Sequence, residues 1–440
     1  MEIADIKKIE SNIDDFSEQM YYLMKSMYPI CRSITGNGVR QTHDIIRKII
    51  PIETKEVPSN TKVLDWVIPK EWNINDAYIK NSSGKIIINF KDSNLHVVNY
   101  SKPIKAKLSL NELKKHIHTL PEQPDLIPYV TMYYHEDWGF CMSHKQFLQL
   151  EEDEYEVVID SSLEDGSLTY SEYYLKGELD DEILISTYTC HPSLCNDNLS
   201  GVVLTTFLAE ILTKLKRKYS YRFLFIPETI GAITWLALNE QKLSKIKYGS
   251  VVNCVGDSGD FTYKKTRQGN SLFDTAVINV LTNSNHNFSI IDFTPTGSDE
   301  RQFSSPGFNL PIGNIMRTFD HNFPEYHTSG DNFDLVKGES LAESLLVYLK
   351  TIFILENNCY FLNSIPKGEP QLGKRGLYNS VGNKQRKKNS ILATQWILNF
   401  SDGSNSLLDI SEKSKIDFET IKESADLLVE NKLLKKGSRK

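Results

Sequence analysis

The chain has 440 residues, of which 40% are hydrophobic and 24% are charged, and it carries a net charge of −7 at pH 7. This length allows two or three domains, the composition is typical of a globular protein, and the acidic balance argues against a general nucleic-acid binder. No apolar run approaches the roughly eighteen residues of a membrane span, and the N-terminus lacks a basic and then apolar signal. Six cysteines with no Cys-x-x-Cys pair are typical of a reducing compartment. We therefore expect a cytoplasmic protein with no membrane partner.

Four segments with different sequence patterns follow one another along the chain. Residues 1–56 predict two helices that belong to the main domain, because apolar residues recur at helical spacing. Residues 57–126 contain short alternating strands separated by turns, which predict a small β-rich inserted domain that could cover a site as a lid. Residues 127–370 are expected to form the catalytic domain, an α/β fold. After a Gly- and Pro-rich linker, residues 377–440 predict a winged-helix domain.

A polar loop in the main domain joins a buried strand to a long apolar helix. It runs from Ser186 to Gly201 and carries one imidazole and one carboxylate, His191 and Asp197. In open α/β sheets, ligands bind beyond the carboxyl ends of the strands, where this loop begins. A neutral His and an Asp on one short loop suit a zinc ion.

Two later segments strengthen the prediction of a zinc site. Glu228 stands at the end of a second buried strand, and His327 lies on a later loop that is followed by a helix. A single-zinc hydrolase needs two or three protein ligands, an open position for water, and a carboxylate that accepts a proton from that water. A carboxylate at the end of an apolar strand is costly to bury without a partner, which favours a functional role for Glu228.

The order and spacing of these residues resemble the co-catalytic zinc aminopeptidase superfamily, which also contains glutamate carboxypeptidases and glutaminyl cyclases. Asp197, four residues before Gly201, matches the bridging Asp of that family, and Glu228 matches its general base. His327 matches the last metal His, and residues 297–303 resemble the loop that lines the substrate pocket. The resemblance covers about residues 126–365 and the N-terminal helices. It implies an α/β fold with a mixed central sheet flanked by helices.

A bacterial branch of aminopeptidase-like proteins is similar in its organisation, with an inserted small domain and a C-terminal winged helix. Members of that branch are often linked to surface-polysaccharide loci. The resemblance therefore implies the same three-part organisation for this chain.

Three departures from the family pattern reduce the expected number of metal ions. Thr229 replaces a Glu that binds the second zinc, Val255 replaces a metal-binding Asp, and Ser193 replaces an Asp that orients the first His. Asp257, two residues after Val255, is a further candidate ligand in a shifted register. We predict one zinc ion rather than two, with an open fourth position. The predicted ligands are His191, Asp197 and His327.

Several cations follow strand ends in the main domain and are expected near the mouth of the pocket. Arginine pairs well with carboxylates, so these cations favour an anionic peptide or amide substrate, although they are equally consistent with solvated surface charges. The predicted substrate-binding residues are Arg301, Arg267, Asp299 and Tyr263.

The C-terminal segment contains a helix-turn-helix pattern whose would-be recognition helix is acidic. Because an acidic face repels phosphates, nucleic acid is not the expected partner. We expect this domain to serve protein contact or homo-oligomer formation.

Two hypotheses of different classes follow. The first is a zinc-dependent hydrolase of peptide or amide bonds, in which Glu228 is the general base. The alternative is a catalytically silent, aminopeptidase-like scaffold or regulatory protein that acts through its winged-helix domain, because a fold does not determine a function.

Overall fold

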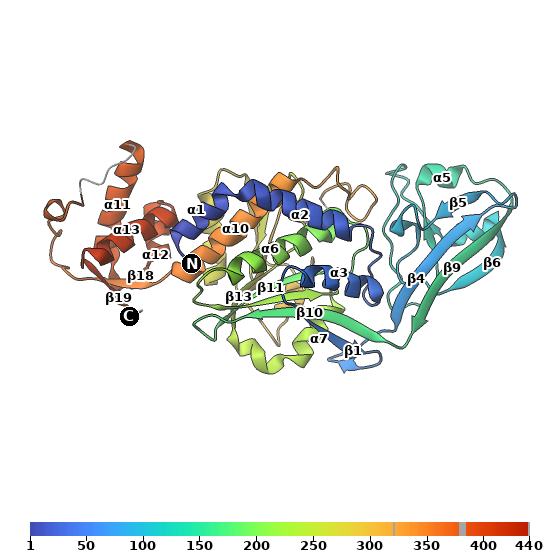
Figure 1. The fold of residues 1–440 in the computed structure, drawn as a ribbon, viewed down its shortest axis with the longest axis horizontal. Helices are drawn as coiled ribbons and strands as arrows, with labels where there is room; N and C mark the ends of the chain where they lie inside the picture. The colour runs from blue at the N-terminus through green and yellow to red at the C-terminus, as the bar shows by residue number, and fades with distance from the viewer. Residues whose placement is uncertain (320–321, 378–383, 439–440) are drawn as a thin grey trace.

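The computed structural model describes residues 1–319, 322–377 and 384–438. The molecule is elongated and consists of three parts in a row (Figure 1). A small β-sheet forms one end, a large mixed sheet covered by helices forms the middle, and the C-terminal helices form the other end.

The middle part is built on an eight-stranded sheet with the order β1-β10-β12-β11-β13-β16-β14-β15. Strands β12, β11, β13 and β16 are parallel to one another, as are β14 and β15, whereas the other neighbours are antiparallel. The mixed central sheet predicted from the sequence is therefore confirmed. The strands are β1 (Glu53–Pro58), β10 (Ser167–Leu175), β11 (Glu182–Tyr188), β12 (Ser220–Ile226), β13 (Ile246–Val251), β14 (Phe261–Lys264), β15 (Phe288–Ile291) and β16 (Ile312–Met316).

Helices cover both faces of this sheet. Every residue of β11 and β12 is buried, as expected for central parallel strands that pack on both sides. Alternate residues serve opposite faces: Ile183 packs into the core with α2, α6 and α10, whereas Leu184 packs into the core with α7. Figure 1 shows α1, α2, α6 and α10 on one side and α7 on the other. These helices are α1 (Ile3–Ser11), α2 (Ile13–Met27), α6 (Gly201–Thr213), α7 (Ile230–Leu238) and α10 (Gly338–Asn357).

The small sheet at one end is antiparallel, with the order β5-β4-β9-β6. Its strands are β4 (Glu71–Lys80), β5 (Ile86–Asn89), β6 (Ile104–Ser109) and β9 (Glu154–Glu164). Strand β9 lies beyond residue 126, where the sequence placed the end of the inserted domain, yet it is an inner strand of this sheet. The sheet has its own apolar core, which includes Val157 and Ile159. Short elements accompany it: β2 (Lys62–Val63), β3 (Trp66–Val67), α4 (Leu110–Leu113), β7 (Ile117–His118), β8 (Phe140–Cys141) and α5 (His144–Leu148).

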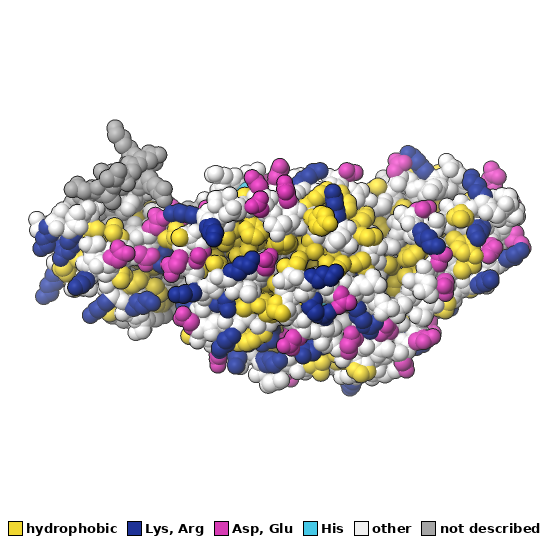
Figure 2. Space-filling model, viewed as in Figure 1, with side chains coloured by type: hydrophobic (Ala, Val, Ile, Leu, Met, Phe, Trp, Pro, Cys, Tyr) yellow, Lys and Arg dark blue, Asp and Glu magenta, His cyan; other side chains and the backbone are white. Residues whose placement is uncertain are grey.

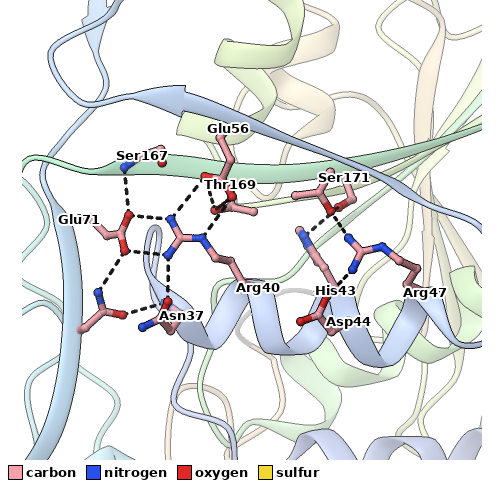
Figure 3. Close-up of polar contacts among 12 residues, drawn as sticks. Asn37, Arg40, His43, Asp44, Arg47, Glu56, Glu71, Ser167, Thr169 and Ser171 are labelled. Atoms are coloured by element: carbon pink, nitrogen blue, oxygen red, sulfur yellow. Dashed lines mark hydrogen bonds and ion pairs between the residues drawn. The ribbon is translucent and has the colours of Figure 1, made fainter.

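A charged network lies where the chain leaves the large sheet and returns to it (Figure 3). Arg40, on α3 (Asn37–Arg47), pairs with Glu71 at the start of β4, with an Nη2–Oε2 distance of 2.6 Å. The same guanidinium contacts Glu56 of β1, at 3.1 Å between Nε and Oε1. Glu71 also accepts a hydrogen bond from the backbone N–H of Ser167, at the start of β10. The network therefore ties both connections of the small sheet to α3.

The C-terminal part is a winged helix, as the sequence predicted. It contains α11 (Lys384–Phe400), β18 (Asp402–Ser406), α12 (Leu407–Ser414), α13 (Phe418–Glu430) and β19 (Leu434–Gly437). Its sheet has the order β18-β17-β19, and β17 (Tyr360–Asn363) follows α10 directly. Phe418 of α13 packs edge-to-face on Phe353 of α10, with ring centroids 6.0 Å apart. The apolar core of the large domain thus continues into the winged helix.

The surface charge is mixed. Figure 2 shows acidic and basic side chains interspersed over the visible face of the molecule. Within the described segments, no helix combines the length and the apolar character that a bilayer crossing requires.

Candidate metal centre

Three loops bring the predicted ligands together. His191 follows β11, Asp197 lies in the helical turn Cys195–Ser200 before α6, and His327 lies on the loop before α10. The Asp197 Oδ2 atom is 3.0 Å from His327 Nε2 and 3.9 Å from His191 Nε2. One ligand atom from each residue lies within 4.8 Å of the others. The two His rings, separated by 136 positions in the chain, therefore face one carboxylate.

The polar atoms of this cluster fit a metal cation. Asp197 Oδ2 and His327 Nε2 are both buried and 3.0 Å apart, yet in the described part of the chain neither atom forms a hydrogen bond of normal geometry. An orphaned buried polar group is costly, and a cation between these atoms would relieve that cost. A His₂Asp donor set is one that zinc accepts.

The protonation states also suit a metal. Burial lowers the pKa of His191 to about 4, so its imidazole is neutral at pH 7. Burial alone raises the pKa of Asp197, but the two imidazoles and the Tyr188 hydroxyl outweigh it and hold that pKa at about 2. Metal ligands must be deprotonated, and both groups meet this requirement at neutral pH.

Neighbouring groups fix the positions of the ligands. Tyr188 donates a hydrogen bond to Asp197 Oδ1, which leaves Oδ2 directed at the two imidazoles. The Asp331 carboxylate accepts hydrogen bonds from the backbone N–H groups of Asn196 and Asp197, at 2.6 and 2.8 Å. Sequence reasoning did not assign this role to Asp331. The available signal was its place four residues after His327 in an acidic, turn-forming stretch.

The orientation of His191 has an unexpected source. Ser193, at the position of the family's orienting Asp, instead donates to the backbone carbonyl of Tyr28. The Cys190 thiol lies 3.2 Å from His191 Nδ1, so the thiol and not a carboxylate contacts this ring nitrogen. Arg32, which is fully buried, donates from Nε to the His191 carbonyl at 2.8 Å.

Glu228 lies beside the cluster, directly after β12. Its Oε2 is 3.9 Å from His191 Nε2, and its side chain is 26% exposed, toward the cavity. Ser298 donates a hydrogen bond to Oε1 at 3.2 Å. Burial, together with the nearby Asp299 and Asp197, raises the pKa of Glu228 well above its ordinary value. A carboxylate that lies beside a metal site and faces the cavity is placed to act as a general base.

The positions that depart from the family pattern contribute no side chain to the His191, Asp197 and His327 cluster found among the described residues. Thr229 donates its backbone N–H to Asp299 Oδ1 at 2.7 Å, and Val255 is buried in the apolar core. Asp257, the further candidate ligand, is not part of the cluster. Its carboxylate instead accepts hydrogen bonds from Asn196 Nδ2 at 3.0 Å and from Thr318 Oγ1 at 2.6 Å. The two-residue shift therefore turns Asp257 toward the loop that carries Asp197.

The predicted substrate-binding residues do not line the cavity in the described part of the chain. Asp299 and Arg301 lie behind the base, where both contact Thr229. Tyr263 is buried and donates to Asp274 at 2.8 Å, and the exposed Arg267 donates to Asn309 at 2.9 Å. Strand order decides which loops face the site, and the sequence alone does not contain that order.

The other cations are engaged within the protein. Lys264 pairs with Glu300 at 2.7 Å with both side chains fully buried, and Arg317 pairs with Glu343. Lys265 pairs with Asp292. The expected gathering of cations at the pocket mouth is therefore not seen among these residues.

A cavity of about 350 Å³ opens in front of the cluster. Several of its walls are aromatic, and sequence reasoning did not assign these aromatic residues to the site. The lining residues are Ile34, Trp66, Tyr129, Thr131, Tyr133, Tyr134, Cys190, His191, Glu228, Thr229, Ile230 and His327.

Comparison with known proteins identifies the family. Residues 21–358 match the family described as a domain of unknown function (DUF4910). The chain belongs to this family. Residues 360–436 match a winged helix-turn-helix family, which agrees with the placement of β17 in that domain. A Clostridium acetobutylicum protein, named for a proposed role in polysaccharide biosynthesis and for an aminopeptidase-like domain, is 55% identical over 433 residues, covering 98% of this chain and all of that protein.

Solved structures agree with the fold. A candidate peptidase from Clostridium acetobutylicum is 54% identical, with a TM-score of 0.93 over 98% of this chain and 100% of that chain. A zinc aminopeptidase from Bacillus subtilis has a TM-score of 0.55 at 12% identity, covering 78% of this chain and 94% of that chain. An M28 peptidase precursor from Shewanella amazonensis has a TM-score of 0.56 at 12% identity, covering 80% and 97%. The resemblance to the zinc aminopeptidase fold is therefore confirmed.

Proposed function

We propose that this protein is a zinc-dependent hydrolase of peptide or amide bonds that uses one metal ion. The observation that carries the proposal is the pair of orphaned buried atoms, Asp197 Oδ2 and His327 Nε2, which share the site with His191 beside the carboxylate of Glu228. Three protein ligands with an open fourth position are typical of catalytic zinc.

The roles of the side chains follow from their places. His191, Asp197 and His327 would hold the ion, which supplies Lewis acidity to the scissile carbonyl and to a water molecule. Glu228 accepts a proton from that water and passes it to the departing amine, because its carboxylate lies beside the ligands and faces the cavity. Cys190 and Tyr188 keep one imidazole and one carboxylate in the required orientation.

We propose one ion because the positions that would bind a second ion lack a free carboxylate. Thr229 and Val255 offer no carboxylate, and the carboxylate of Asp257 is engaged by Asn196 and Thr318. A small peptide or amide remains the proposed substrate. The expected preference for an anionic substrate has no supporting contact, because no Lys or Arg is among the described lining residues.

Metal analysis combined with one substitution tests the proposal. The full-length protein purified with zinc is expected to hold about one ion per chain after dialysis, by elemental analysis. Glu228→Gln should retain this ion and lose roughly 10²–10⁴-fold in turnover of amide substrates. Glu240→Gln, an exposed glutamate on the same domain, is the matched control and should change neither quantity. A protein that holds no zinc contradicts the proposal, and full turnover by Glu228→Gln contradicts the assignment of the base.

The second candidate function is a silent scaffold that acts through the winged helix. The supporting observation is that α13 packs against α10, and ion pairs join Lys7 to Glu423 and Lys350 to Glu419. These contacts engage acidic residues of the would-be recognition helix within the chain, which supports protein contact over nucleic-acid binding. Homo-oligomer formation through this domain is tested by light scattering on the full-length protein. Absence of stoichiometric zinc would favour this candidate over the hydrolase.

A further inference from the structure

The walls of the active-site cavity combine aromatic faces with hydroxyl groups. Tyr129 and Tyr133 lie side by side, with their hydroxyl oxygens 3.0 Å apart, and Thr131 lies between them in the chain. One hydroxyl donates to the other, so the pair offers a ligand one further O–H donor together with oxygen lone pairs. The cavity therefore offers apolar surface and neutral hydrogen-bonding hydroxyls to the same ligand.

Exposed aromatic residues continue this wall outward at the mouth of the cavity. Trp66 and Tyr134 both line the cavity and are 38% and 47% exposed, with ring centroids 5.5 Å apart. Leu64 and Val67, on the same β2–β3 hairpin as Trp66, are also about half exposed. We call Trp66 and Tyr134, whose rings are in contact at the cavity, the mouth platform. A contiguous exposed apolar patch that adjoins a site marks a binding surface.

The hairpin that carries Trp66 of the mouth platform is anchored. Val63 and Ile68 flank the exposed residues 64–67 and are almost completely buried in the core that contains α7. Ser59 donates to the Pro69 carbonyl at 2.8 Å, and the Tyr100 hydroxyl donates to the Lys70 carbonyl. The rings are therefore held outward by a fixed frame, which is the arrangement of a binding subsite.

The charges of the cavity limit what this subsite can bind. Glu228 is the only acidic residue among the described lining residues, and none of them is Lys or Arg. One zinc ion with Asp197 leaves a single positive charge, which Glu228 balances. No surplus carboxylate remains for a free α-amine, because Thr229 and Val255 replace two acidic positions. The described lining residues likewise offer no Lys or Arg side chain to pair with a free carboxylate.

We propose, resting on the hydrolase function above, that the substrate is an uncharged N-acyl amine whose amine-side body lies on the mouth platform. Water adds to the acyl carbon, the C–N bond breaks, and the products are a carboxylate and an amine that takes up the proton carried by Glu228. The combination of aromatic ring faces and hydroxyl groups favours an amino sugar whose amine is acylated. The C–H face of such a sugar stacks on the rings of the mouth platform, and its hydroxyl groups form hydrogen bonds with Tyr129 and Tyr133.

The test measures binding to the zinc-loaded Glu228→Asp protein by calorimetry, because this variant slows turnover and keeps the negative charge that balances the ion. Two neutral probes are methyl N-acetylglucosaminide and N-acetylleucinamide, and two charged probes are leucinamide and N-acetylleucine. The neutral amides are expected to bind at least about tenfold more tightly than either charged probe. If methyl N-acetylglucosaminide binds more tightly, the substrate is an acylated amino sugar. If N-acetylleucinamide binds more tightly, the substrate is a peptide with blocked ends. Equal or tighter binding of a charged probe overturns the proposal, as does no binding of either neutral probe.

Substitutions on the mouth platform provide the second arm. Trp66→Ala and Tyr134→Ala should each weaken binding of the preferred neutral probe by roughly 3- to 10-fold, with unchanged zinc content and thermal midpoint, because both rings are largely exposed. Tyr22→Ala, an exposed tyrosine on α2, is the matched control and should bind like the parent. Unchanged binding by both platform variants overturns the proposal. If the parent protein does not retain zinc, the result contradicts the proposed hydrolase function rather than the proposed substrate.

Discussion

Asp331 holds the backbone of the metal ligand Asp197: its Oδ2 accepts a hydrogen bond from the Asp197 N–H at 2.8 Å. Its Oδ1 accepts from the Asn196 N–H at 2.6 Å. Asp331 follows the ligand His327 by four positions, so one segment supplies both a ligand and the clamp on another ligand's loop. The separation between two of the three ligands is therefore set by one carboxylate.

Replacing Asp331 should weaken metal binding without removing a ligand. Groups that orient metal ligands typically account for about 10–100-fold in affinity, so Asp331→Ala is expected to lose zinc affinity by that factor. Asp331→Asn retains one acceptor and should lie between Asp331→Ala and the parent. Competition with a chromophoric chelator measures the affinity, and circular dichroism checks the fold. The exposed neighbour Asp334 provides the control, since Asp334→Asn should bind zinc normally. Parent-like affinity in folded Asp331→Ala would refute the clamp.

The Arg40–Glu71 pair should make the free energy of unfolding depend on pH in the acidic range. Hydrogen bonds from Arg40 hold the pKa of Glu71 at about 2, whereas an unfolded glutamate titrates near about 4.3. Because the folded pKa is depressed, this contribution is fully present above about pH 4.3 and is lost as the pH falls toward 2. Glu71→Gln should cost about 1 kcal/mol of unfolding free energy at pH 7, a value discounted because the pair is partly exposed. The difference from the parent in unfolding free energy should shrink as the pH falls from about 4.3 toward 2 in urea titrations.

The same variant reports on the junction of the small sheet. Glu71 contacts both Arg40 and the Ser167 N–H, so Glu71→Gln should increase protease cleavage where the chain enters and leaves that sheet (Figure 3). Glu18→Gln, an exposed glutamate on α2, should show neither the pH dependence nor the extra cleavage. A stability difference that stays constant from pH 7 to pH 3 would argue against the assigned role of Glu71.

The buried Lys264–Glu300 pair should stabilise the loop behind the base. Both side chains are fully buried at 2.7 Å, and Glu300 adjoins Asp299, which accepts the Thr229 N–H beside Glu228. Glu300→Gln leaves an uncompensated buried ammonium, which should cost about 3–5 kcal/mol by urea denaturation. The double variant Lys264→Met with Glu300→Leu removes both charges and should recover part of this loss. Additive losses in this double-mutant cycle would show that the two side chains act independently.

Local sequence patterns were sufficient for the central strands and for the metal ligands. Strands β11 and β12 are buried on both faces, so they appear as continuous apolar runs that need no tertiary information. The ligands His191 and Asp197, and Glu228, follow such strands directly, and the ends of parallel strands meet at one edge of the sheet. The acidic winged helix was likewise visible in its helical pattern, and it is present at residues 360–436.

Contacts between distant segments were decided only by the tertiary structure. The order of strands places Arg267 away from the cavity and brings Trp66 and Tyr134 to its mouth, because strand order depends on which apolar faces pack together. The Asp331 clamp joins segments 134 positions apart, and no local pattern marks a hydrogen bond to a distant backbone N–H. The sequence by itself therefore predicted which residues form the candidate metal cluster. Only the tertiary structure determined which residues surround this cluster. The free energy of packing depends on contacts between segments that are distant in the sequence and meet only in the folded chain.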